Sequence, residues 1–243
     1  MRIAVFGANG ATGRHVIRQA LATDDEIVAL VRRPASFPYT GPRLRVVAGD
    51  VRDAESVDAT VAGADAVLST IGVPFSRDPI DIYSAAATAV ADAMRRHGVR
   101  RIAVVSSSAV EAHERTEGWL FERVLQPMVV NGIGRTTYAD MRAAEEIVAH
   151  SGLDATIVRA SGLFPADAVS DYRADTAHAP GAFTSRPDLA HFLLRQAREP
   201  EWIGTRPEVH TDDGTPSLLR MIWDEGIRHT PDPILRDPAL ETV

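Results

Sequence analysis

The sequence predicts an α/β fold in which helices cover both faces of an open, doubly wound parallel sheet. Two observations predict it. Apolar runs of strand length alternate six times with helical patterns, and several runs are apolar throughout, as strands covered on both faces require. The first run then breaks into glycines at Gly7, Gly10 and Gly13, which is typical of a tight turn from a strand into a helix.

The first two thirds of the chain divide into regular elements. Strands are expected at residues 3–6, 26–31, 44–48, 64–68, 101–105 and 155–158. Helices are expected between them at residues 14–21, 53–61, 80–97, 119–130 and 136–150. The third of these helices stops at Gly98, since glycine commonly ends a helix.

Regular patterns become sparse after residue 160. The stretch 160–181 is rich in Pro, Asp and Gly, so we expect it to be irregular. A helix over 186–198, with Pro187 in its first turn, is followed by a strand near 208–211 and a helix near 217–225. No linker or internal repeat divides the chain, so we expect a single domain of residues 1–243.

Composition excludes several classes of protein. The 243 residues are 45% hydrophobic, and the net charge of −7 is spread along the chain. No apolar run reaches the roughly 18 residues of a membrane span, and positive charge does not cluster as a nucleic-acid surface requires. We therefore expect a soluble, cytoplasmic protein whose partner is a small molecule, with no nucleic acid and no membrane.

Two residue types are absent, and each absence removes some chemistry. Without cysteine there are no disulfides and no thiolate nucleophiles, and the eight histidines show no metal-binding spacing, so we expect no metal. There is also no lysine, so all 26 basic residues are arginine. Because arginine stays protonated, it cannot replace a lysine as a proton donor or Schiff-base amine.

The glycine turn has a specific chemical use. At the carboxyl ends of parallel strands, such a turn presents backbone N–H groups and a helix N-terminus to a pyrophosphate. Gly7 permits the tight turn, Gly10 permits close approach of the ligand, and Gly13 permits close packing of the helix on the strand. Any α/β protein can contain a tight turn of this kind, but its place after the first of six strands favours a dinucleotide.

Four motifs in combination resemble one family. They are GANGATG from residue 7, VRRP from residue 31, GDVRD from residue 49 and DMRAAEEIVAHSGLDATIVRASGL from residue 140. Over about residues 1–210 the chain resembles the atypical short-chain dehydrogenase/reductase proteins, in particular the NmrA-like and biliverdin/flavin reductase-like NAD(P)H-binding branch. The resemblance implies a Rossmann-type fold with bound NADPH, and it names no substrate.

The end of the second strand indicates which dinucleotide is preferred. A carboxylate there accepts hydrogen bonds from a ribose 2′-OH, whereas arginines pair with a 2′-phosphate. This chain has Arg32 and Arg33, with Arg14 nearby at the start of the first helix. We therefore expect NADP(H), the alternative being that Arg32 and Arg33 are only a solvated pair.

Three other segments complete the expected cofactor site. Asp50 and Val51 follow the third strand, where the family has its adenine contacts, although Asp50 could instead cap the next helix. Small residues from 69 to 72 would approach the nicotinamide-side ribose. The expected cofactor-binding residues are Gly7, Asn9, Gly10, Ala11, Thr12, Gly13, Arg14, Arg32, Arg33, Asp50, Val51, Ser69, Thr70, Ile71, Gly72 and Ser106.

The residues available for catalysis depart from the family pattern. Many short-chain dehydrogenases reduce carbonyls with a serine, a tyrosine and a lysine, and this chain has no lysine. Ser107 and Ser108 lie at the appropriate strand end and Tyr138 at the start of the appropriate helix, so these three are the candidate catalytic residues.

Arg142 offers one substitute for the missing lysine. It lies four residues after Tyr138, on the same helix face, where its charge would lower the tyrosine pKa. Alignment on the Ser-Gly-Leu of residues 151–153 instead puts Thr137 and Met141 at the tyrosine and lysine positions. On that alignment Tyr138 packs on the helix and Arg142 is solvated.

These observations together predict an NADPH-dependent reductase. It would transfer hydride to a small conjugated or aromatic acceptor (flavin, quinone or ketone) without a Ser-Tyr-Lys set. The alternatives are a non-catalytic NADP(H)-binding regulatory protein, and an isomerase or dehydratase on the same fold. Residues from about 160 to 243 would form a small C-terminal lobe that covers the substrate, and a homodimer stays open. The loop residues that would face the substrate, unless they are merely solvated, are His113, Glu114, Asp171, Tyr172 and His178.

Overall fold

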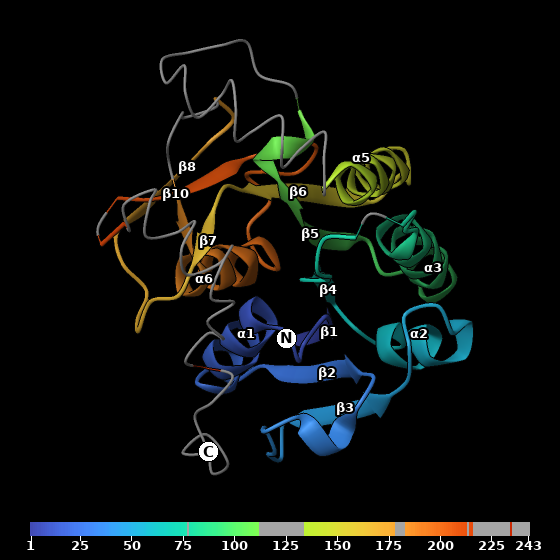
Figure 1. The fold of residues 1–243 in the computed structure, drawn as a ribbon. Helices are drawn as coiled ribbons and strands as arrows, with labels where there is room; N and C mark the ends of the chain where they lie inside the picture. The colour runs from blue at the N-terminus through green and yellow to red at the C-terminus, as the bar shows by residue number, and fades with distance from the viewer. Residues whose placement is uncertain (77, 112–133, 178–182, 213, 216–233, 235–243) are drawn as a thin grey trace.

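A computed structural model describes residues 1–76, 78–111, 134–177, 183–212, 214–215 and 234. One sheet has the strand order β3-β2-β1-β4-β5-β6-β10-β8, in which β8 alone runs antiparallel (Figure 1). Its strands are β1 Arg2–Phe6, β2 Glu26–Val31, β3 Leu44–Ala48, β4 Ala66–Ser69, β5 Arg101–Ser107, β6 Asp154–Ala160, β8 Tyr172–Asp175 and β10 Glu208–Thr211. The predicted doubly wound parallel sheet is confirmed, and its order reverses between β1 and β4.

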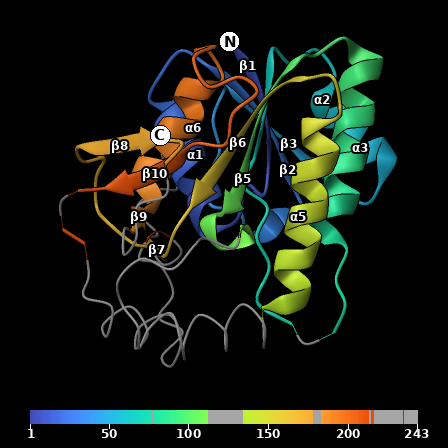
Figure 2. The same ribbon diagram turned by 90° about the horizontal axis from the view of Figure 1, so that it is seen from above.

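Helices cover both faces of the sheet. Helices α1 (Ala11–Leu21) and α6 (Arg186–Gln196) pack together on one face. Helices α2 (Ala54–Val61), α3 (Ile82–His97) and α5 (Arg135–Ala149) lie on the other face, with α3 against α5 (Figure 2). Each layer encloses its own cluster of buried apolar side chains, so β1 is covered completely on both faces.

The two ends of the sheet differ from the expectation. We expected residues 44–48 to be a buried strand, but β3 is an edge strand in which Arg45, Val46 and Ala48 are exposed. The segment expected to be irregular contains β8 and also β7 (Leu163–Phe164), which pairs with β9 (Thr184–Ser185). An apolar run therefore does not reveal whether its strand is central or at an edge.

Two expected helices, residues 119–130 and 217–225, lie outside the described residues. A short 3-10 turn, η1 (Pro34–Ser36), follows β2, and a second, η2 (Ser108–Val110), follows β5. Of the helices in the described ranges, none combines the length and apolar character needed to cross a membrane.

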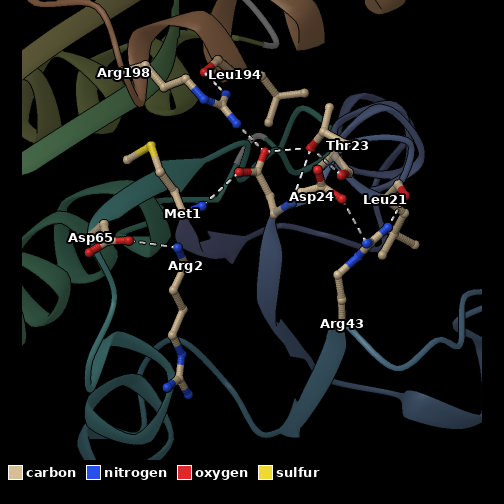
Figure 3. A network of polar contacts seen from close by, with 11 residues as sticks. Met1, Arg2, Leu21, Thr23, Asp24, Arg43, Asp65, Leu194 and Arg198 are labelled. Carbon is tan, nitrogen blue, oxygen red and sulfur yellow. Dashed lines mark hydrogen bonds and ion pairs between the residues drawn. The ribbon is translucent and has the colours of Figure 1, made fainter.

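Polar contacts around Met1, Thr23 and Arg198 connect the start of β1 with the start of β2 (Figure 3), and the buried carboxylate of Asp25 accepts bonds from all three. Asp25 is 3% exposed and accepts hydrogen bonds from the Thr23 hydroxyl at 2.7 Å and from the Met1 ammonium at 3.0 Å. It also pairs with Arg198, which follows α6. Burial alone would raise the pKa of the Asp25 carboxyl, but these hydrogen bonds outweigh it and hold the pKa below its ordinary value of 3.8.

We expect Asp25→Ala to lower the free energy of unfolding by about 1–3 kcal/mol at neutral pH, because charged hydrogen bonds to a buried group are lost. A lowered native pKa stabilises the fold above the unfolded value, and this contribution disappears as the pH falls below 3.8. Urea unfolding at several pH values measures the difference. Asp24→Ala is the matched control, since the Asp24 carboxylate is fully exposed and pairs with Arg43 at 3.2 Å. A difference between Asp25→Ala and wild type that does not shrink in acid would contradict this explanation.

Candidate functional site

The first turn is built on two close backbone contacts. Gly7 has φ of +78°, and a Cβ there would lie 2.6 Å from the Thr70 carbonyl, so only glycine fits. A Cβ on Gly13 would lie 2.2 Å from the Gly7 oxygen, which means that α1 packs directly on the turn. The sequence assigned these two glycines to the tight turn and to helix packing, and the geometry agrees.

The third glycine is less closely confined. A Cβ on Gly10 would meet only the Gly7 oxygen, at 3.3 Å. Gly10 is the N-cap of α1, which has no acidic residue in its first turn, whereas Asp53 caps α2 and Ser185 caps α6. The first N–H groups of α1 are therefore available to an anion at the carboxyl edge of the sheet.

Arg14 stabilises this turn through hydrogen bonds to neighbouring segments. Its guanidinium is 9% exposed and donates to Asn9 Oδ1 at 2.8 Å, to the Ser36 carbonyl at 3.1 Å and to the Ile234 carbonyl at 3.3 Å. Burial lowers the Arg14 pKa, with a smaller opposing effect from Tyr39. All three acceptors are uncharged, so this cation adds positive potential where η1 meets the glycine turn.

Arg32 and Arg33 are differently placed. Both are exposed at the end of β2, and within the described ranges neither has an ion-pair partner. Asn9 Nδ2 donates to Ser36 Oγ at 3.1 Å, which ties η1 to the glycine turn beside the two arginines. The pair is thus free to receive an anion next to the turn.

The structure distinguishes among the other expected cofactor residues. Asp50 does not cap α2, because Asp53 does so by accepting from the N–H groups of Glu55 and Ser56. Asp50 accepts instead from the Arg52 N–H at 3.0 Å. Val51 is 7% exposed and packs in the core beneath α2, so its side chain is not available to line a ring as we expected.

The loop after β4 contains one anchored residue and one open residue. Thr70 donates its hydroxyl to the Phe6 carbonyl at 3.1 Å, which fixes the loop to β1. A Cβ on Gly72 would have no neighbour within 4 Å, so this part of the loop faces open space. Ser69 and Ile71, on either side of Thr70, are partly exposed.

The three serines at the end of β5 and the start of η2 have different surroundings. Ser106 is 5% exposed and donates to Glu145 Oε1 at 2.5 Å, so its hydroxyl is already engaged by α5 and not by the expected cofactor. Ser107 accepts from the Ala109 N–H at 3.2 Å, and its side chain lies close enough to the Tyr138 hydroxyl to lower the pKa of that phenol. Ser108 is buried in η2. The structure therefore brings together Ser107 and Tyr138.

The proposed effect of Arg142 on Tyr138 is wrong. Burial raises the Tyr138 pKa above its ordinary value of 10; the Ser107 hydrogen bond opposes the rise, and nearby Tyr83 adds to it. Arg142 donates to the Val110 carbonyl instead. Tyr138 is accordingly a neutral phenol at physiological pH, and it is able to donate a proton.

An ion cluster behind Ser106 was not found from the sequence. Glu145 is 4% exposed and receives a two-pronged contact from Arg159, at 3.2 and 2.8 Å, and a third bond from Arg206 at 3.3 Å. Arg159 is 8% exposed and also pairs with Glu111. The cluster joins β5, α5, β6 and the approach to β10, and no local pattern announces it because its members lie far apart in the chain.

The remaining loop candidates divide into two groups. His113, Glu114 and His178 lie outside the described residues. Tyr172 donates to or accepts from His191 Nδ1 at 2.7 Å and packs edge-on against Phe192, so α6 holds it, and Asp171 beside it is exposed. In the described part of the chain, no group of three or more acidic or histidine side chains could hold a metal ion.

Comparison with a protein-family model gives a match over residues 7–200, and the family is described as NAD(P)H-binding. Among curated proteins, an uncharacterized protein of Mycobacterium bovis is 38% identical over 108 residues, which are 44% of this chain and 12% of that protein. The chain thus matches only a small part of this much longer relative.

Two solved structures have the same fold. The anaerobilin reductase ChuY from Escherichia coli O157:H7 aligns with a TM-score of 0.71 at 23% identity, over 89% of this chain and 100% of that one. A short-chain dehydrogenase/reductase from Veillonella parvula, solved in complex with NADP, aligns with a TM-score of 0.73 at 20% identity, over 89% and 98%. At these identities the comparison shows a shared fold.

Proposed function

Because this chain belongs to the NAD(P)H-binding family, we propose that it is an NADPH-dependent reductase acting on a small conjugated or aromatic acceptor such as a flavin, a quinone or a ketone. The family and the structural neighbours confirm the resemblance to atypical short-chain dehydrogenase/reductase proteins. The observation that carries the proposal is the glycine turn with Arg32 and Arg33 beside it, two exposed arginines that have no ion-pair partner among the described residues.

The residues around the turn fit this cofactor. The N–H groups at the start of α1 would receive the pyrophosphate, since Gly10 leaves their approach open. Arg32 and Arg33 would pair with a 2′-phosphate, which NADH lacks. Arg14 would act indirectly, by holding Asn9 and η1 in place and adding positive potential.

When bound, NADPH supplies a hydride. The chain supplies position, because the loop after β4 and the end of β5 would form the walls that hold the acceptor near the nicotinamide. Orientation of this kind can contribute roughly 7–11 kcal/mol. Tyr138 would give a proton to the reduced acceptor, and Ser107, which lies beside the phenol, would help to orient it. This arrangement needs no lysine.

The test follows NADPH absorbance while the purified protein meets a panel of flavins, quinones and ketones. We expect turnover well above the protein-free rate with at least one of them. Tyr138→Phe should lower kcat by about tenfold or more and leave the affinity for NADPH unchanged, because only the proton donor is lost. Tight NADPH binding without turnover on any acceptor would contradict the reductase and favour the regulatory protein.

A further inference from the structure

The N-terminus of α3 is capped from another helix. Asp81, at the N-cap position, makes no capping bond with its side chain. The carboxylate of Asp140 on α5 does so instead, accepting from the Tyr83 N–H at 2.8 Å and the Ser84 N–H at 3.2 Å. It also accepts the Ser84 hydroxyl at 2.5 Å, and it is 6% exposed. The start of α3 is therefore fixed to the first turns of α5 by a buried charge.

The capped residue Tyr83 extends this link to the loop after β4. Its hydroxyl accepts the N–H of Val73 at 3.2 Å, and the residue is 9% exposed. Val73 follows Gly72, whose missing side chain leaves open space. The orientation of this peptide is thus set by a side chain whose own backbone is held by Asp140.

The same loop also makes two contacts with α5 directly. The Thr136 hydroxyl donates to the Ser76 carbonyl at 2.9 Å, and the Phe75 ring lies 5.7 Å from the ring of Tyr138. Phe75 is 48% exposed, so its contact with the Tyr138 ring is not shielded from solvent by the Phe75 side chain. Bonds from α3 and α5 therefore control where the loop lies relative to Tyr138.

A small cavity connects this arrangement to the sheet. Ser69, Ile71, Tyr83 and Ser106 are among the residues that line it, and its volume is about 40 Å³. Ile71 and Tyr83 both lie on the wall of this cavity, so the loop after β4 and the start of α3 meet there. Asp140 raises the pKa of Tyr83, although burial raises it more, and the hydroxyl keeps its proton.

We propose that Asp140 and Tyr83 are positioning residues for the nicotinamide half of the cofactor, because they fix the peptide of Val73 and with it the loop that follows β4. This inference rests on the proposed function, since it requires the nicotinamide to lie at that loop. Neither residue takes part in hydride or proton transfer. The adenosine half is bound at the glycine turn and η1, and it should not depend on them.

The test compares NADPH with adenosine 2′,5′-bisphosphate, which lacks the nicotinamide half, by isothermal titration. We expect Tyr83→Phe to weaken NADPH binding about three- to tenfold, the loss of one hydrogen bond, and to leave the affinity for the bisphosphate unchanged. Its melting temperature should stay close to that of wild type, because Val73 is partly exposed and its N–H can reach water. Asp140→Asn should also weaken the binding of NADPH. Asp81→Ala, which changes the residue at the N-cap position, should bind both ligands as tightly as wild type does.

The possible outcomes distinguish a failure of the positioning role from a failure of the proposed function. If wild type binds both ligands and Tyr83→Phe binds NADPH equally well, the positioning role is overturned and the proposed function stands. The same holds if Tyr83→Phe weakens both ligands to the same extent, which is the result of a general structural defect. A wild-type protein that binds neither ligand overturns the proposed function and the positioning role with it.

Discussion

Gly13→Ala is expected to lower the free energy of unfolding by about 1–3 kcal/mol or more and to abolish NADPH binding. The added Cβ would lie 2.2 Å from the Gly7 oxygen and 2.8 Å from the Ala8 Cα. Both neighbours are backbone atoms of the turn, so no flexible side chain can move aside. Urea unfolding measures the first effect, and titration with NADPH measures the second.

Gly10→Ala is the matched control for that substitution. Its Cβ would meet only the Gly7 oxygen, at 3.3 Å, which is tight but needs a shift of only a few tenths of an ångström, so the loss of stability should be much smaller than for Gly13→Ala. The methyl group would occupy the path by which a pyrophosphate approaches the N–H groups of α1, and we expect affinity for NADPH to fall about tenfold or more. If both variants were destabilised equally, or if Gly10→Ala bound NADPH normally, the roles assigned to the two glycines would be wrong.

Glu145→Ala is expected to cost about 3–5 kcal/mol of stability, because it leaves Arg159 as a buried cation without its main partner. The carboxylate receives bonds from Arg159, Arg206 and Ser106, and the residue is 4% exposed. Chemical denaturation at neutral pH gives the value.

Glu146→Ala controls for the general effect of removing a carboxylate from this helix. Glu146 is 58% exposed and contacts Arg206 at 3.5 Å and His150 at 3.6 Å, so we expect a loss of about 1 kcal/mol or less. A Glu145→Ala protein as stable as the Glu146→Ala protein would contradict a structural role for the cluster.

Local patterns predicted the elements that local interactions form. The first strand and α1 follow from apolar spacing, and the turn between them follows from the crowding of Gly13 against the Gly7 oxygen. The apolar run of β3 looked like that of β2, yet β3 lies at the edge of the sheet. Exposure there depends on strand order, which is a property of the whole fold.

The part of the site that was missed depends on contacts between distant segments. Asp140 caps a helix that begins 58 residues earlier, and Glu145 pairs with Arg159 and Arg206 across three elements. Tyr83 is noticeable in the sequence as the only aromatic residue of an alanine-rich helix. Nothing in the local sequence, however, identifies Val73 as its partner. The sequence paired Tyr138 with the wrong neighbour, because helical spacing points to Arg142 whereas in the fold Ser107 lies beside the phenol.

The central claim is that this chain binds NADPH at the glycine turn and selects it through Arg32 and Arg33. Isothermal titration of wild type, Arg32→Ala and Arg33→Ala with NADPH and with NADH tests it most directly. Arg45→Ala serves as the control, because Arg45 is an exposed arginine on β3. We predict that wild type binds NADPH at least about tenfold more tightly than NADH, and that only the first two variants narrow the gap. Equal affinity of wild type for NADPH and NADH, or a preference that survives both substitutions, would contradict the claim.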